Sequence, residues 1–174
     1  GHEARRAAAA ATLEAIEATE AIDDVDTVTR ADLSAELRLQ LALHEAGAHL
    51  RDVNVIASPA QDVRSVFDLM PTDTVEDWDV ISDRLRGVPV ALSGYVQTLR
   101  EGIRTGVVPA RRQVREVITQ IARYTADNGF FAEFAHEAAP AEGHLPASLA
   151  RALFEHAGAA RVAYDELAGF FRDE

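Results

Sequence analysis

Apolar side chains recur at steps of three and four residues through most of this 174-residue chain, and this spacing is the strongest constraint on its fold. One such series is Val88, Leu92, Val96, Leu99 and Ile103. Steps of three and four place side chains on one face of an α-helix, whereas half-buried strands alternate every second residue. Since no comparable stretch has period two, we predict an all-α fold, a multi-helix array of about six to seven helices.

Two helices are expected before residue 50. Residues 3–22 are rich in alanine, glutamate and leucine, with no helix-breaking residue among them. The acidic and β-branched stretch after them is interpreted as a connection. A second helix is then expected from a cap at Thr29 or Asp32 to about Ala46, with Gly47 as its terminator.

Caps and prolines predict the later helices. Ser58 and Pro59 indicate the start of a short helix that Pro71 ends. Thr74 and Asp77 stand three apart, as in a capping box. Three further prolines are each expected to open a helix, namely Pro89, Pro109 and Pro146.

The chain is long enough for one core, so we expect a single helical domain or lobe over residues 1–174, with possible linkers at 23–29 and 138–146. It does not begin with methionine, and its last expected helix is still apolar and periodic at Glu174. We therefore expect one lobe of a larger helical protein.

Composition excludes several function classes. With no cysteine, disulfide frameworks and thiolate metal sites are impossible. A net charge of −12 argues against nucleic-acid binding, which needs a concentrated positive surface. The cluster Arg111, Arg112 and Arg115 is interpreted as a solubilising helix face, with phosphate binding as the alternative. No membrane span or signal peptide is recognisable, which predicts a cytoplasmic protein.

The stretch "LALHEAGAHL" contains His44, Glu45 and His49. Zinc-binding helices place two histidines four apart, about 40° around the axis, whereas a spacing of five gives about 140°. On one continuous helix the two rings would point to different sides, and we interpret them as structural. The alternative is that Gly47 breaks the helix and lets them converge.

A second stretch, "HEAAPAEGHL", offers His136, Glu137, Glu142 and His144. Its alanine, glycine and proline content is typical of a solvated linker, and loops hold metal ligands imprecisely. A small metallohydrolase using His136, Glu137 and His144 stays open as an alternative. We interpret His156 as a hydrogen-bonded core histidine. No catalytic, cofactor-binding or metal-ligating residue is assigned to this chain.

Four segments in order carry a family resemblance: "VFDLMP", "TVEDW", "RLRGVPVAL" and "LREGIRTGVVPARRQVREVI". With them, residues 30–174 resemble the N-terminal helical half of the bacterial domain-of-unknown-function 885 family. The resemblance implies a carboxypeptidase Taq-like zinc metallopeptidase fold, with a deep groove between two helical halves. The family's His-Glu-x-x-Pro-Gly-His-His zinc helix lies in the C-terminal half, so zinc is expected there and not on this chain.

These observations support two function classes. The leading hypothesis is the non-catalytic N-terminal part of a zinc-dependent carboxypeptidase-like hydrolase, which walls one side of a peptide-binding groove. Acidic side chains in that wall would favour basic peptide ends, and the partner would be the C-terminal half of the same protein. The alternative is a stand-alone helical module for protein interaction or small-ligand binding, which could self-associate through apolar helix faces.

Overall fold

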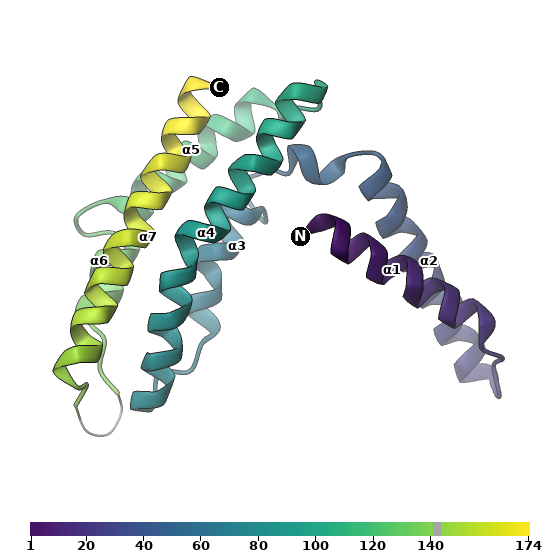
Figure 1. Cartoon of the computed structure of the whole chain (residues 1–174), viewed down its shortest axis with the longest axis horizontal. Helices are drawn as coiled ribbons and strands as arrows, with labels where there is room; N and C mark the ends of the chain where they lie inside the picture. The colour runs from purple at the N-terminus through teal and green to yellow at the C-terminus, as the bar shows by residue number, and fades with distance from the viewer. Residues whose placement is uncertain (141–143) are drawn as a thin grey trace. The chain divides into compact units, whose positions relative to one another are not determined.

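The structure, a computed structural model, describes residues 1–140 and 144–174 (Figure 1). Its described residues form seven α-helices and two short 3-10 helices, with no strand among them, which confirms the predicted all-α fold. In chain order they are α1 (His2–Ala18), α2 (Asp24–Glu45), η1 (Ala48–Arg51), α3 (Pro59–Ser65), η2 (Val66–Leu69), α4 (Val75–Thr105), α5 (Arg111–Thr125), α6 (Phe130–His136) and α7 (Ala147–Asp173).

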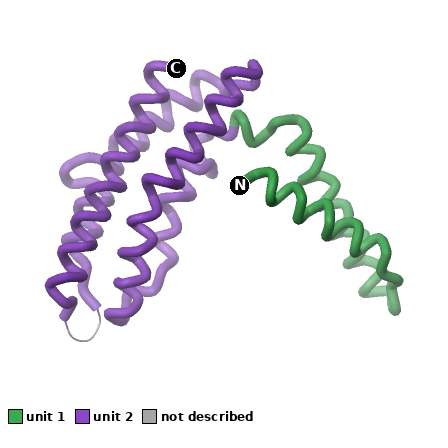
Figure 2. Tube along the Cα trace, in the orientation of Figure 1, with its two compact units in different colours: residues 1–51 green, residues 52–174 purple. Residues whose placement is uncertain are grey.

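The chain divides into two compact units, residues 1–51 and residues 52–174 (Figure 2). This boundary coincides with neither expected linker. Most of 23–29 is helical, as the start of α2. Residues 138–140 and 144–146 are irregular, as expected, and 141–143 lie outside the described residues. The single domain remains a prediction.

In the first unit, α1 and α2 form a helical hairpin in which α2 begins earlier than predicted. Asp23 is its N-cap, and its Oδ1 accepts a hydrogen bond of 2.8 Å from the backbone N–H of Asp26. The predicted start at Thr29 or Asp32 was wrong, because the acidic residues interpreted as a connection act as the cap and first turn. In the first turn their negative charges interact favourably with the positive end of the helix dipole and stabilise the helix start.

The α1–α2 hairpin buries few side chains. No side chain of α1 is buried, and in α2 only Ser34 and Leu37 are. Near the hairpin turn, the Arg30 guanidinium donates a 2.9 Å hydrogen bond to the carbonyl oxygen of Thr19. Since hydrophobic stabilisation scales with the apolar area removed from water, α1 is held by a small free energy.

The second unit has the larger core, built around the long helices α4 and α7, which pack side by side (Figure 1). The fully buried α4 side chains Ile81 and Leu85 share this core with Leu153 and Tyr164 of α7. Helices α5 and α6 also pack on α7. Helix α6 was not predicted, because Asn128–Gly129 indicates a helix end and no further helix was expected before the one that starts near Pro146.

The sequence predicted that Pro89 opens a helix, and this prediction was wrong. Pro89 lies inside α4, which is 31 residues long. A proline removes one backbone hydrogen bond and usually kinks or ends a helix. Here the buried series continues on both sides of it, through Leu85, Val88 and Leu92. Burial of that stripe against α7 explains why the helix continues through the proline.

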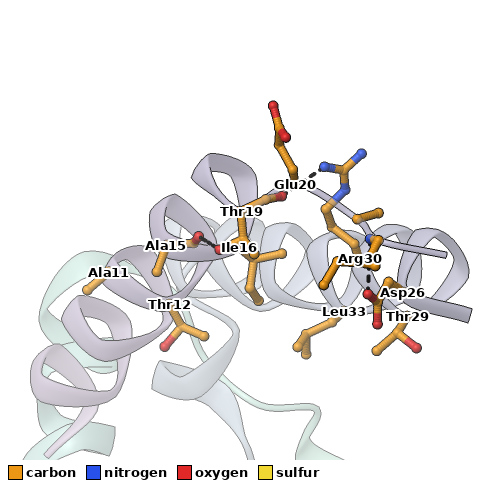
Figure 3. A pocket seen from close by; sticks show the side chains of 12 residues that line it. Ala11, Thr12, Ala15, Ile16, Thr19, Glu20, Asp26, Thr29, Arg30 and Leu33 are labelled. Carbon is orange, nitrogen blue, oxygen red and sulfur yellow. Dashed lines mark hydrogen bonds between the residues drawn. The ribbon is translucent and has the colours of Figure 1, made fainter.

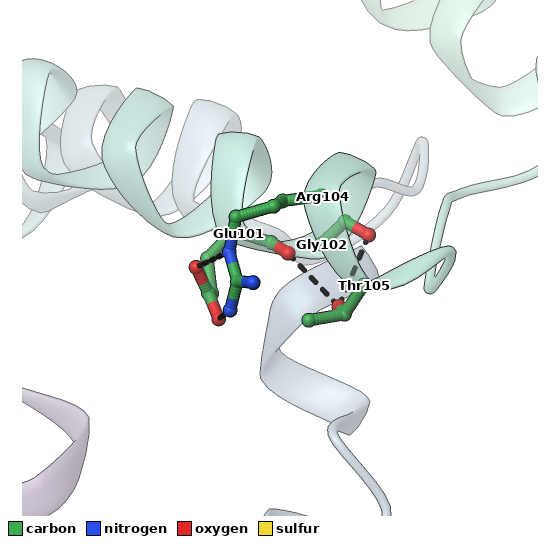
Figure 4. Close-up of polar contacts among 4 residues, drawn as sticks. All are labelled: Glu101, Gly102, Arg104 and Thr105. Carbon is green, nitrogen blue, oxygen red and sulfur yellow. Dashed lines mark hydrogen bonds and ion pairs between the residues drawn. The ribbon is translucent and has the colours of Figure 1, made fainter.

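The ends of α4 have the chemistry that the sequence indicated. Thr74 and Asp77 form the predicted capping box. At the other end, Gly106 has a φ of 76°, a left-handed conformation that favours glycine. In the last turn, the Thr105 hydroxyl donates to the carbonyl oxygen of Glu101 at 2.9 Å, and Arg104 pairs with the Glu101 carboxylate (Figure 4).

Candidate functional sites

The segment of residues 52–58 is non-helical, and side chains of three helices fix its backbone. Gln113 and Gln120 of α5 bracket Val55: Gln113 Oε1 accepts from its N–H at 3.1 Å, and Gln120 Nε2 donates to its carbonyl at 3.0 Å. Tyr95 of α4 donates to the Asp52 carbonyl oxygen at 2.6 Å. Burial raises the pKa of Tyr95, so its hydroxyl remains a donor at physiological pH.

Gln61, on α3, completes this network. Its Oε1 accepts from the Ser58 N–H at 3.0 Å, and its Nε2 donates to the Asn54 carbonyl at 3.0 Å and to Gln120 Oε1 at 2.6 Å. Ser58 is completely buried. Satisfied buried polar networks specify a single arrangement, so the segment is preorganised. It presents the side chain of Ile56, which is 85% exposed, to solvent.

A groove of about 500 Å³ lies where α4 and α7 end and α5 begins, entirely within the second unit. We call it the α4–α5–α7 groove. Most of its lining is apolar, and its charged members are three arginines and one glutamate. The lining residues are Leu99, Ile103, Val108, Pro109, Arg111, Val114, Arg115, Ile118, Phe170, Phe171, Arg172 and Glu174.

The charged part of this groove is suited to an anion. Arg111, Arg115 and Arg172 are exposed, and none of them forms an ion pair with another described residue. Helix α5 starts here, with no acidic residue in its first turn and with Ala110 as an N-cap that offers no side-chain acceptor. The N–H groups of such a helix start attract negative charge.

The three arginines that the sequence places close together, Arg111, Arg112 and Arg115, therefore line two different hollows. Arg111 and Arg115 line the groove, and Arg172 joins them from α7, 57 positions further along the chain than Arg115. Arg112 instead lines a separate hollow with Val55 and Gln113. The contribution of Arg172 could not be found from the sequence, because it depends on how α7 packs against α5.

His44 and His49 lie together in the first unit, whereas on one continuous helix their rings would point to different sides. Their rings stack with centroids 4.5 Å apart. Gly47, with a φ of 67°, comes just after the end of α2 at Glu45 and turns the chain into η1. The helix therefore ends before Gly47, as the sequence predicted, and this break brings the two rings together; that the two histidines are structural stays a prediction.

Two further residues, His2 and Glu3, join this histidine cluster from α1. The His2 ring is 4.7 Å from that of His49, and Glu3 Oε1 is 3.3 Å from His44 Nε2. Burial lowers the pKa of His2 and of His49, which favours their neutral forms. Sequence reasoning missed His2 and Glu3, because only the pairing of α1 with α2 brings them to His44.

The buried His49 Nδ1 has no hydrogen-bond partner, and the buried His44 Nε2 has only the ion-pair contact with Glu3, without the geometry of a hydrogen bond. The His44 and His49 rings stack face to face and do not point at a common centre. Among residues 1–140 and 144–174, no group of three or more histidine, aspartate or glutamate side chains is arranged to hold a metal ion.

The second His-Glu stretch is spread over a helix end and a loop. His136 closes α6, with its ring 6.0 Å from that of Phe154, and Glu137 is the C-cap. His144 is exposed in the irregular segment before α7, and Glu142 lies outside the described residues.

The hydrogen bond predicted for His156 is present, but the residue is half-buried and lies at the edge of the core instead of inside it. Its Nδ1 is 2.9 Å from the hydroxyl of Ser82, which is buried in α4.

A second groove, of about 600 Å³, lies between α1 and α2 (Figure 3). Its walls include Ala15, Ile16 and Leu33. The polar side chains at its end are already engaged, since Asp26 accepts from the Ile22 N–H and Arg30 donates to Thr19. The groove therefore offers apolar surface but few free polar groups to orient a ligand.

Comparison with known families gives one result. The bacterial family described as a protein of unknown function (DUF885) matches residues 1–174, and the chain belongs to this family. The match includes the N-terminal residues 1–29, which precede the segment that carried the resemblance. No curated protein matches the chain. In the part of the chain that the structure describes, no helix is both long enough and apolar enough to cross a membrane.

Proposed function

We propose that this chain is the non-catalytic N-terminal helical part of a zinc-dependent carboxypeptidase-like hydrolase, and that residues 52–174 form one wall of its peptide-binding groove. Membership of the family supports the relationship, and the sequence resemblance supplies the expected chemistry. The observation that carries the proposal is the α4–α5–α7 groove, which combines an apolar floor with arginines that have no ion-pair partner among the described residues.

The end of a peptide has the chemistry that this groove would accept. A peptide ends in a carboxylate, and the side chain of its last residue is attached to the neighbouring Cα. Arginine binds carboxylates through two parallel hydrogen bonds. Helix α5 would offer the carboxylate both the Arg115 guanidinium and the backbone N–H groups of its first turn, which no side chain caps. The apolar floor, with Leu99 and Phe171, would take the last side chain.

This assignment changes one expectation from the sequence. An acidic wall was expected to favour basic peptide ends, yet the charged residues of this groove are Arg111, Arg115 and Arg172 against Glu174. We therefore propose that an apolar peptide end with a free carboxylate binds here. The resemblance places the zinc ligands in the C-terminal half, so in this proposal the present chain binds and orients the peptide only.

The location of peptide binding tests the proposal. Methyl resonances of the 174-residue chain would be followed by NMR while a tetrapeptide ending in leucine is added, once as the free acid and once as the amide. The acid is expected to shift the methyl groups of Leu99, Val114 and Ile118 without being hydrolysed. Shifts elsewhere, or equal shifts with the amide, would exclude this groove as a carboxylate site.

One observation favours the alternative of an interaction module. Four large apolar side chains of α2 are at least 48% exposed, namely Val25, Val28, Leu39 and Leu43. Such a row of apolar side chains is suited to packing against another helix. Sedimentation of the chain as a dimer that Leu39→Gln dissociates would favour this function, and a monomer at all concentrations would count against self-association.

A further inference from the structure

The histidine cluster closes the open end of the α1–α2 hairpin. His2 is the first residue of α1, His44 lies in the last turn of α2, and His49 lies in η1. His49 is in contact with both other rings, at 4.7 Å from His2 and 4.5 Å from His44. The cluster therefore holds the start of α1 against the end of α2 and against η1.

The rest of the α1–α2 contact is weak, because α1 has no buried side chain. A helix of 17 residues with no buried anchor has a marginal stability of its own in water. The free energy that holds α1 on α2 is therefore small. A modest repulsion inside the cluster would be enough to release it.

Protonation would produce such repulsion. The charged side chains that face His2 and His49 are Arg5 and Glu3 of α1. Only Glu3 is negative, and its two oxygens are already engaged: Oε2 pairs with Arg6 at 3.0 Å, and Oε1 lies 3.3 Å from His44 Nε2. Two imidazolium rings, those of His2 and His49 at 4.7 Å, would thus repel each other beside a carboxylate that other groups already engage. Protonation of His49 would also add an N–H donor at its buried Nδ1, which has no hydrogen-bond partner.

The direction of the pH effect can be derived from the pKa shifts. Burial lowers the pKa of His2 and His49 in the folded hairpin below their ordinary values. The unfolded or undocked state then binds more protons, so docking is fully stable above the ordinary histidine pKa and is lost as the pH falls through the lowered values.

We propose that the cluster of His2, His44 and His49 is an acid-sensitive latch, in which protonation of His2 and His49 in mildly acidic solution releases α1 from α2. The proposal concerns the first unit alone and does not depend on the peptide groove. Its consequence is that mild acid exposes the apolar face of α1 and the inner face of α2, including Ile16 and Leu33.

Hydrogen exchange measured by mass spectrometry tests the latch. Exchange of α1 peptides in the 174-residue chain would be compared with that of α4 peptides in the same sample, at pH 7.5 and pH 5.0, after correction for intrinsic rates. In the native chain, protection of α1 is expected to fall about tenfold relative to α4, which corresponds to about 1.4 kcal/mol. Equal protection ratios at the two pH values would overturn the proposal, as would an α1 already unprotected at pH 7.5.

Two variants separate the latch from general acid sensitivity. His49→Gln stays neutral at both pH values and is expected to lose most of the fall in protection. His144→Gln removes an exposed histidine outside the cluster, and should behave like the native chain. If His49→Gln undocks α1 at every pH, Glu3→Gln decides: it removes the facing negative charge and must move the release to higher pH. An unchanged or lower midpoint would refute the latch.

Discussion

Replacing Gln61 with leucine should destabilise the second unit strongly, although the two side chains are similar in volume. Gln61 Oε1 is the acceptor for the N–H of Ser58, which is completely buried, and Gln61 Nε2 donates to Gln120 Oε1. The Asn54 carbonyl would keep its hydrogen bond from the Ser58 hydroxyl. Two groups are thus left without a partner. Gln120 is only half-buried beside a hollow, so the completely buried Ser58 N–H carries most of the penalty, and we expect a loss of about 1–3 kcal/mol.

Urea unfolding followed by tryptophan fluorescence measures this loss directly. Trp78 is the only tryptophan and is 4% exposed in the second unit, so its emission reports the unfolding of that unit. Gln97→Leu is the matched control, because Gln97 is exposed on α4, and it should change the free energy of unfolding by less than about 0.5 kcal/mol. A Gln61→Leu variant within about 0.5 kcal/mol of the native chain would refute the claim that this network fixes residues 52–58.

Three further perturbations can be measured by the same unfolding assay. Leu153→Ala removes a fully buried side chain between α7 and α4, and should cost about 2–5 kcal/mol; a loss below about 1 kcal/mol would contradict the packing described. Gly106→Ala places a side chain at a φ of 76° with no neighbour within 4 Å, so we expect only the backbone strain, about 1–2 kcal/mol. Asp52 has its pKa raised by burial and by the Asp62 carboxylate, so its charged form destabilises the fold. Asp52→Asn should therefore be more stable than the native chain at pH 7, with the difference lost as the pH falls through the raised pKa towards pH 3, and a constant difference would contradict this cause.

The fold class and several helix boundaries could be predicted because the signals are local. Ser58 with Pro59, and Thr74 with Asp77, specify helix starts through contacts within four residues. Pro89 was misleading because the burial of α4 against α7 outweighs the preference of proline for helix starts. Asp23 and Asp26 were misleading because acidic residues suit both a solvated linker and a helix cap.

The candidate sites were harder to predict, because they combine residues distant in sequence. Arg172 meets Arg115 only after α7 packs on α5, and His2 meets His49 only when α1 folds back on α2. Gln61 stands three residues after Ser58, as in a capping box, and sequence reasoning missed this signal, whereas Gln120 belongs to no recognisable motif. Gly47 is visible in the sequence as a possible helix terminator, but its backbone conformation decides whether the neighbouring histidines converge. Local patterns do not contain that information.

The central claim, that the α4–α5–α7 groove holds a peptide carboxylate, is tested most directly by a thermodynamic cycle. Calorimetry would give the dissociation constants of the free-acid and amide forms of a leucine-ending tetrapeptide for the native chain, Arg115→Gln and Arg112→Gln. Arg112 is adjacent in sequence to Arg111 but lies outside the groove, which makes it the matched control.

The account predicts that the native chain binds the acid about tenfold more tightly than the amide, a difference of about 1.4 kcal/mol. This preference should disappear in Arg115→Gln and persist in Arg112→Gln. Equal affinity for the acid and the amide in the native chain, or the same loss in both variants, would contradict the assignment of this groove as the carboxylate-binding wall.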